Sequence, residues 1–153
     1  MITGPTTEQL LVDVARELRE VILPRIDDAT VRVSVEMLEQ VVRSCAVRAA
    51  HELAWMAEEE AAILTFARRL PASAGLARAL AAHAEHVADH GEGLHLDDCV
   101  ARYRSASVVL SEAIEAAFAS ADPGLVAEAR AIVLARNAHE IEARPGFYFP
   151  GRA

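Results

Sequence analysis

The longest stretch of the chain without a glycine or a proline, the residue types that most often end helices, covers residues 29–70. Apolar residues recur through it in alternating steps of four and three, which is the spacing of a helix packed lengthwise against other helices. On a helical wheel centred on Leu38, one narrow seam collects Val31, Val35, Val42, Cys45, Ala49, Leu53 and Met56. The pattern predicts one very long helix, or two helices stacked end to end.

A shorter helix is predicted before this stretch, from Thr6 or the following threonine to Leu23. Thr6 and Gln9 have the spacing of a capping box, in which each side chain binds the other residue's backbone N–H. The proline after Leu23 ends the helix, because a residue that precedes proline disfavours helical backbone. Two aspartates, at positions 27 and 28, then supply an N-cap and a favourable negative charge at the start of the long helix.

Three further helices are predicted after residue 70. Ser73 is expected to cap a helix that runs to about His90, before two glycines, and Asp97 to cap the next one. A turn at residues 122–124 leads into the last helix, which ends near Ile141. Five or six helices with short connections favour an antiparallel bundle.

The predicted fold class is therefore all-α, an antiparallel bundle of five or six helices built around the long helix at 29–70. At 153 residues the chain has the length of one domain, so residues 1–153 are expected to form a single helical-bundle domain. The segment 144–153 is expected to be an extended, aromatic C-terminal tail.

Composition and charge narrow the function classes. Hydrophobic residues make up 53% of the chain but aromatic residues only 5%, which predicts a core of alanine, leucine and valine. The formal net charge is −8, and no basic run exists that would release counterions from nucleic acid or bind an anionic membrane surface. No apolar run approaches the roughly 20 residues that span a bilayer. We therefore expect an acidic, soluble, cytoplasmic protein without nucleic-acid or membrane partners.

The first two helices resemble a known family. The residues that carry the resemblance are Pro5-Thr-Thr-Glu-Gln-Leu-Leu, the stop at Glu20-Val-Ile-Leu-Pro, and Arg32-Val-Ser-Val at the entry to the long helix. They resemble an uncharacterised bacterial helical family of unknown function, often encoded beside aminoglycoside-phosphotransferase-like kinases and acyl-CoA dehydrogenases. The resemblance covers about the first 55 residues. It implies an accessory or partner-binding protein and supplies no active-site residues.

A histidine cluster carries the main candidate chemistry. His83, His86 and His90 are spaced so that one helix points all three rings the same way. Neutral imidazoles in this arrangement are metal ligands, and Glu52 or Glu59 on the long helix is expected to complete the set. The alternative is a buried histidine that is hydrogen-bonded to a carbonyl or a carboxylate, which needs no metal. The preferred prediction is therefore that the protein has no cofactor. The alternative prediction is that it binds a divalent metal.

The aromatic residues indicate an interface. Phe147, Tyr148 and Phe149 stand together in the tail, and three adjacent aromatic side chains left in water would form an exposed apolar patch. They are expected to bury on their own bundle or on a partner subunit. Trp55 lies off the apolar seam of the long helix, so it meets a second layer of helices or marks an interface, where tryptophan is enriched.

Nucleophilic catalysis has little support in the sequence. No Gly-x-Ser-x-Gly motif, phosphate loop or dinucleotide fingerprint is present. Cys99 stands beside Asp97 and Asp98, whose negative charge disfavours a reactive thiolate. Arg136 and His139, near the end of the last helix, are interpreted as caps of its C-terminus.

Three functional hypotheses follow. The preferred one is a non-catalytic helical-bundle protein that acts through homo-oligomerisation or through binding another protein. The second is a metal-binding bundle that uses His83, His86 and His90 with Glu52 or Glu59. The third is a bundle whose alanine-lined interior accepts a small apolar acyl-type ligand, with a histidine fixing its orientation.

Overall fold

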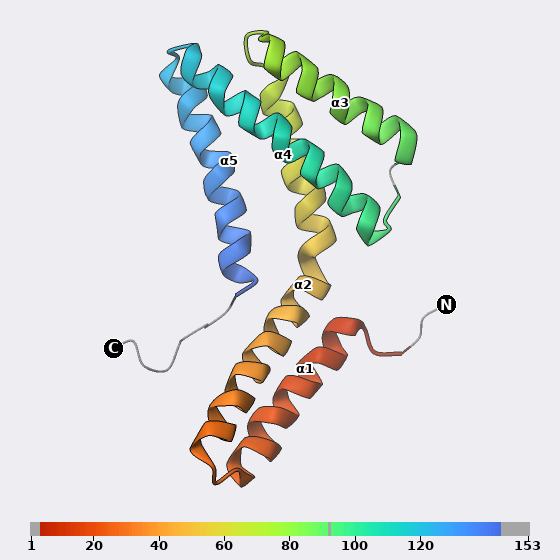
Figure 1. Cartoon of the computed structure of the whole chain (residues 1–153), viewed down its shortest axis with the longest axis vertical. Helices are drawn as coiled ribbons and strands as arrows, with labels where there is room; N and C mark the ends of the chain where they lie inside the picture. The colour runs from red at the N-terminus through yellow and green to blue at the C-terminus, as the bar shows by residue number, and fades with distance from the viewer. Residues whose placement is uncertain (1–3, 92, 145–153) are drawn as a thin grey trace. The chain divides into compact units, whose positions relative to one another are not determined.

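A computed structural model describes residues 4–91 and 93–144, and these residues form α-helices without any strand (Figure 1). The predicted all-α bundle is therefore confirmed. The five α-helices are α1 (Thr7–Glu17), α2 (Ala29–Ala67), α3 (Ala74–His90), α4 (Leu96–Ala119) and α5 (Pro123–Glu142). Between α1 and α2 lie a π-helical turn, η1 (Leu18–Ile22), and a 3₁₀ turn, η2 (Leu23–Arg25). The tail from residue 145 lies outside the described residues.

The helix starts follow the local sequence closely. Thr6 and Gln9 form the predicted capping box, with hydrogen bonds of 3.2 and 2.9 Å. The Asp28 carboxylate caps α2 by accepting hydrogen bonds from the N–H groups of the second and third residues after it. Ser73 caps α3 as predicted, but α4 begins two residues earlier than expected, with His95 rather than Asp97 at its N-cap position. The two following aspartates lie instead in the first turn of α4, where negative charge favours the helix dipole.

The long predicted helix is one helix rather than two. It runs without a break from Ala29 to Ala67, three residues short of the predicted end. Helical turns likewise continue through η1 and η2 to Arg25, past the predicted stop at Leu23. The proline after Leu23 does not end them, because it lies in the first turn of η2, where its missing N–H is not needed. No helix in the described part of the chain is long and apolar enough to cross a membrane.

Contacts between residues divide the chain into two compact units, each of which is described by itself. Unit 1 comprises Met1–Glu52 and His139–Ala153, and unit 2 comprises Leu53–Ala138. The helices α2 and α5 each contribute residues to both units. The sequence-based expectation of a single domain stays a prediction.

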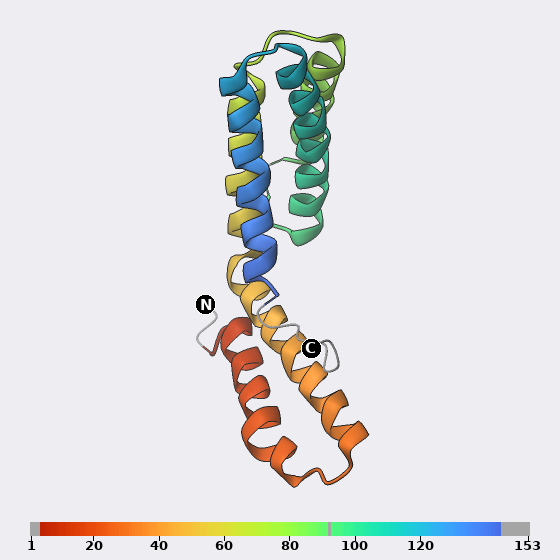
Figure 2. The same ribbon diagram turned by 90° about the vertical axis from the view of Figure 1, so that its left-hand side faces the viewer.

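Unit 2 has a hydrophobic core. The second part of α2, α3, α4 and α5 surround it, and α3 runs beside α4 (Figures 1 and 2). Ile63, Phe66 and Val109 are its largest fully buried side chains. Much of the rest of the core is alanine, as the composition predicts, and Ala106, Ala113 and Ala117 on α4 are completely buried. The other core residues are Ala67, Leu70, Leu76, Ala79, Leu110, Ala116 and Ala129.

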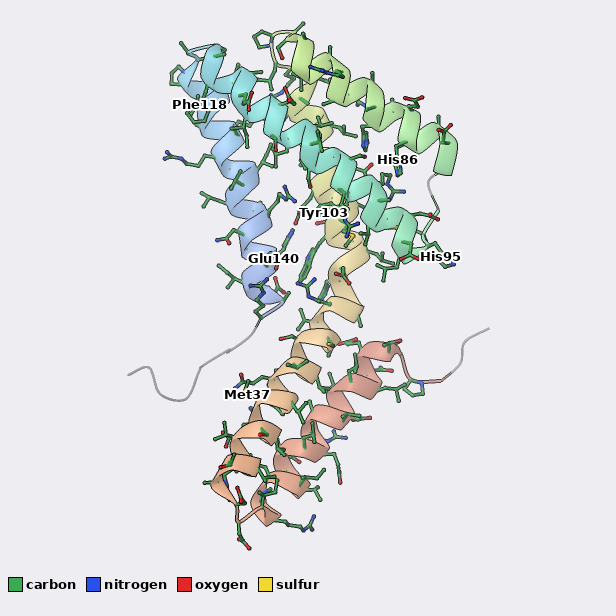
Figure 3. The ribbon with its side chains drawn as sticks, viewed as in Figure 1. Met37, His86, His95, Tyr103, Phe118 and Glu140 are labelled. Atoms are coloured by element: carbon green, nitrogen blue, oxygen red, sulfur yellow. The ribbon has the colours of Figure 1, made fainter. Side chains whose placement is uncertain are left out.

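Unit 1 is packed differently. In it α1 lies along the first part of α2, but none of the leucine, isoleucine, valine or methionine side chains in its described part is buried. The buried residues of unit 1 are small or polar: Ala15, Glu39, Ser44, Ala46 and Ala143. Met37, for example, is exposed on α2 (Figure 3). The large apolar side chains in the described part of this unit are therefore either exposed or only half-buried.

The predicted burial of the α2 seam is wrong for its N-terminal half. Leu38, at the centre of the seam, is 56% exposed, and Cys45 on the same seam is also exposed. The reason is the side on which α1 packs. Glu39 and Ala46 are buried, and they lie about 80–100° around the helix from Leu38. Glu39 is therefore an inward residue, and the seam around Leu38 stays exposed.

Candidate functional site

The buried polar residues of unit 2 form the most organised cluster of functional groups. At its centre is Glu59 on α2, which is only 8% exposed. Its carboxylate accepts a hydrogen bond from the Tyr103 hydroxyl on α4 and another from Arg136 Nε on α5, at 3.0 Å. Arg136 also donates to the Tyr103 oxygen at 2.6 Å and to the Ser107 hydroxyl at 3.1 Å. One carboxylate thus connects three helices.

The neighbouring glutamate forms a second set of contacts. Glu60 accepts a hydrogen bond from Arg102 Nε on α4 at 2.7 Å and lies 3.3 Å from His83 Nε2 on α3. The other ring nitrogen of His83, Nδ1, is 2.6 Å from the Ser105 hydroxyl. Because a carboxylate only accepts hydrogen bonds, we assign the proton of the neutral ring to Nε2. Nδ1 is then an acceptor that shares the one Ser105 hydroxyl proton with the backbone carbonyl of Arg102.

Burial sets the titration of these groups. Desolvation lowers the pKa of His83, and this effect outweighs the nearby Glu60 carboxylate, which raises it. Burial also raises the pKa of Tyr103, with help from its hydrogen bond to Glu59. The hydrogen bond to Glu60 raises the pKa of Arg102. His83 is therefore neutral near neutral pH, while Tyr103 keeps the proton that it donates.

We expect His83 to make unit 2 sensitive to acid. Its pKa is lower in the folded state than the usual 6.5, so the unfolded chain binds a proton more readily, and stability falls as pH drops through 6.5 towards the lowered value. The variant His83→Gln should show a smaller loss of urea midpoint between pH 7.5 and pH 5 than the wild type. His95→Gln, at an exposed histidine, is the control. An equal loss in His83→Gln and the wild type would contradict this assignment.

The geometry of Ser105, His83 and Glu60 resembles a hydroxyl–imidazole–carboxylate relay, but the surroundings do not suit acyl transfer. Ser105 lies within α4, where the backbone N–H groups are used in helical hydrogen bonds. The described residues near it therefore offer no backbone oxyanion hole. The Ser105 hydroxyl is also 2.8 Å from the backbone carbonyl of Arg102. The arrangement suits a structural network that fixes how α2, α3 and α4 pack.

The structure brings together only part of the predicted metal site. His83 is buried and contacts Glu60, whereas Glu59 is bound by Tyr103 and Arg136, and His86 is half-buried on α3. Glu52, in unit 1, pairs with Arg48 at 2.9 Å, and the His90 side chain lies outside the described part. Within that part, no three His, Cys, Asp or Glu side chains are grouped to hold a metal ion. The geometry thus favours a buried, hydrogen-bonded His83 over the predicted metal site.

Sequence reasoning missed six members of these two sets of contacts: Glu60, Arg102, Tyr103, Ser105, Ser107 and Arg136. Arg136 does not cap the end of α5 as expected, because it lies six residues before the helix end and binds Glu59. A signal for Tyr103 was present in the sequence. A tyrosine on the apolar face of a helix needs a partner for its hydroxyl, and that partner had to come from another helix.

The predicted interface residues are described only in part. Trp55 is half-buried on α2. Phe147, Tyr148 and Phe149 lie outside the described residues, so their role as interface residues stays a prediction.

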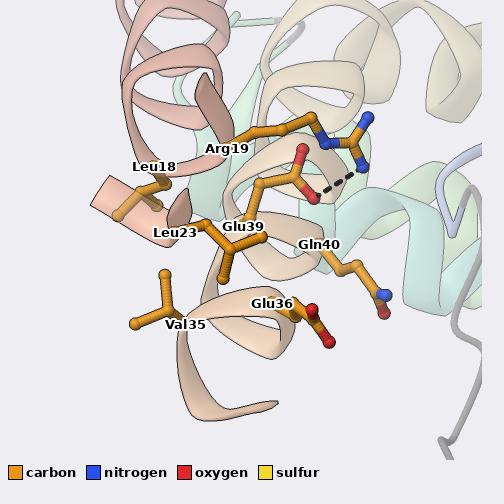
Figure 4. A pocket seen from close by; sticks show the side chains of 7 residues that line it. All are labelled: Leu18, Arg19, Leu23, Val35, Glu36, Glu39 and Gln40. Carbon is orange, nitrogen blue, oxygen red and sulfur yellow. Dashed lines mark hydrogen bonds and ion pairs between the residues drawn. The ribbon is translucent and has the colours of Figure 1, made fainter. Parts of the chain in front are cut away.

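Unit 1 contains a different kind of surface. Its exposed large apolar side chains, which we call the unit 1 apolar surface, are Leu10, Val12, Val14, Ile22, Val31, Val33, Met37, Leu38, Val41 and Ile141. Beside them, Glu39 is buried between two arginines, Arg43 on α2 and Arg19 on η1, the latter at 3.3 Å. Arg19 and Glu39 line a pocket of about 200 Å³ between the turn and α2 (Figure 4).

A third feature is an apolar groove between α4 and α5 of unit 2. Its volume is about 180 Å³, and it is lined by Ile114, Phe118, Val126, Ala129, Arg130, Val133 and Leu134. Val133, predicted to face inward, is 44% exposed here because Leu125 and Ile132 take the core side of α5. No histidine lines this groove, so the predicted acyl ligand with an orienting histidine stays a prediction.

Comparisons with known proteins add no relative. The chain matches no protein-family model, and searches of curated proteins and of solved structures likewise found no match. The resemblance in the first two helices therefore stays a prediction, and function is argued from the geometry alone.

Proposed function

We propose that this protein acts through self-association, with the unit 1 apolar surface as its contact surface. One observation carries the proposal: in the described part of unit 1, every leucine, isoleucine, valine and methionine is at least partly exposed. Unit 2 of the same chain buries Ile63, Phe66 and Val109 almost completely, so the contrast lies within one protein.

The physical reason is the size of the unit. Two helices packed on each other can bury one stripe of each, and here the fully buried positions hold alanines and a glutamate that is paired with arginines, while leucines and valines beside them are only half-buried. Soluble monomers rarely expose contiguous apolar patches larger than a few hundred Å². A second pair of helices would turn the hairpin into a four-helix bundle, in which both apolar stripes of each helix are covered.

The mass of the protein in solution tests the proposal. Light scattering coupled to size exclusion should give a multiple of the 16.5 kDa chain mass for the wild type. Leu38→Glu, which places a charge in the contact, should raise the dissociation constant by about 30-fold or more, the effect of losing an interface residue worth about 2 kcal/mol.

Val108→Glu is the matched control. Val108 on α4 is exposed to the same degree as Leu38 but belongs to unit 2, so its substitution should leave the mass unchanged. A wild type with the mass of one chain at every concentration would overturn the proposal, because another part of the chain or a different protein would then cover this surface. An unchanged mass for Leu38→Glu would overturn the assignment of the surface.

A further inference from the structure

The groove between α4 and α5, which we call the α4–α5 groove, gathers most of the exposed large apolar side chains of these two helices. Three such side chains, Phe118, Val133 and Leu134, line it, and the others that α4 and α5 carry in unit 2 are Leu96 and Val108. Phe118, which is 64% exposed, lies beside the start of α5 (Figure 3). Since unit 2 already encloses a buried core, the groove is a separate feature of this unit.

The charge of the groove comes from Arg130 on α5. A second cavity, of about 510 Å³, adjoins the groove and shares Phe118, Val126 and Arg130 with it. Among the described residues, no acidic side chain lines either cavity, and Arg130 forms no ion pair. The nearest acid along α5, Glu128, is paired with Arg69. An anion in the groove therefore meets a positive charge and no acidic side chain in the lining.

The size of the groove limits what it can hold. Its volume of about 180 Å³ is slightly larger than that of an engineered apolar cavity of about 150 Å³ that binds benzene. An apolar group of about six to eight carbon atoms therefore fits. Small-molecule sites commonly combine mainly apolar walls with a few polar groups that fix the orientation of the ligand.

The position of Arg130 decides between possible occupants. An occupant that is apolar throughout, such as an apolar helix face, would cover the guanidinium without offering an acceptor, which costs free energy. A carboxylate offers two acceptor oxygens in the geometry that a guanidinium binds best. We propose that the α4–α5 groove binds a small apolar carboxylic acid, with its apolar part against Phe118 and Leu134 and its carboxylate on Arg130. Every residue of this site belongs to unit 2, so the site does not depend on the self-association proposed for unit 1.

A binding titration with phenylacetate tests this site on the full chain. Its neutral analogue phenylacetamide has the same ring and almost the same shape, so the pair isolates the contribution of the charge. Two-dimensional NMR of the isotope-labelled protein gives both the dissociation constant and the residues that respond. Phenylacetate should bind with a dissociation constant of about 1 mM, and phenylacetamide about tenfold more weakly, because only the acid forms a charge-assisted hydrogen bond with Arg130.

Three variants locate the interaction. Arg130→Gln should weaken phenylacetate binding about tenfold and leave phenylacetamide binding unchanged, because it removes the charge alone. Leu134→Ser, which reduces the apolar wall, should weaken both ligands. Arg104→Gln is the control for charge, since Arg104 is an exposed arginine of α4 that does not line the groove, and it should change neither affinity. Because the three substituted residues are exposed, all variants should keep the circular dichroism spectrum of the wild type.

Two results would overturn the inference. If the acid and the amide bind equally well, or if Arg130→Gln binds the acid as tightly as the wild type, Arg130 does not select a carboxylate. If the residues of the groove show no response at tenfold the expected dissociation constant, the groove is not a site for such acids. A lower mass of Phe118→Glu in light scattering would in that case identify the groove as a contact with a second copy.

Discussion

Replacing Glu59 with alanine is expected to lower the free energy of unfolding of unit 2 by about 3–5 kcal/mol. The substitution leaves the half-buried Arg136 without its carboxylate and the half-buried Tyr103 without the acceptor of its hydroxyl. Removing one partner of a buried charged pair costs more than the pair itself contributes, because the remaining charge stays desolvated. Urea unfolding followed by circular dichroism measures the loss.

Two matched variants make this result specific. Glu58→Ala changes the adjacent, exposed glutamate of the same helix and should alter stability by less than about 0.5 kcal/mol. Tyr103→Phe removes only the hydroxyl and should cost about 1–3 kcal/mol, less than Glu59→Ala. Equal effects of Glu58→Ala and Glu59→Ala would show that the network around Glu59 does not hold the helices together.

Replacing Phe66 with alanine should destabilise unit 2 by a similar amount, about 3–5 kcal/mol. Phe66 is 1% exposed and lies in a core made largely of alanine. The loss combines the burial of the aromatic ring with the cavity that remains, and alanine neighbours have no long side chains that would move to fill it. Denaturant unfolding or calorimetry measures the change.

Phe118 offers an internal control for the core. It has the same side chain but is 64% exposed on α4 (Figure 3), so Phe118→Ala should change stability by less than about 0.5 kcal/mol. A loss for Phe118→Ala as large as that for Phe66→Ala would mean that Phe118 is buried in solution, for instance by association of the α4–α5 groove.

These expected results place stability and interaction in different parts of the chain. Unit 2 has a buried core and two ionic networks that tie α2 to its neighbours. Unit 1 has neither a comparable core nor buried aliphatic side chains in its described part. This division places the buried core in one unit and the exposed aliphatic side chains in the other. This is the physical basis for proposing an interaction protein rather than assigning catalysis to the buried histidine.

Much of the local structure could be predicted from the sequence because its causes are local. The capping box of Thr6 and Gln9, the cap at Ser73 and the uninterrupted helix from Ala29 each depend on residues within one helical turn or on the absence of glycine and proline. The small-residue core followed from composition, since a chain rich in alanine and poor in aromatic residues has few other side chains to bury.

The candidate site could be predicted only in part. His83 was singled out by its place on an apolar stripe, and it is buried. The sequence did not identify its carboxylate partner. Glu59 and Glu60 are adjacent on α2, and their side chains point about 100° apart around the helix. In the structure Glu59 contacts Tyr103, and Glu60 contacts His83. Nothing local distinguishes the two.

Helical content, the caps at Thr6 and Ser73 and the alanine-rich core were thus determined by the sequence itself. The tertiary structure decided which faces meet: α1 covers the side of α2 that holds Glu39 and Ala46, and the seam around Leu38 stays open. The physical reason is that α2 has apolar residues on more than one side. Periodicity shows that a helix has a face to bury, but the rotation of that helix against its neighbours depends on contacts between residues far apart in the chain.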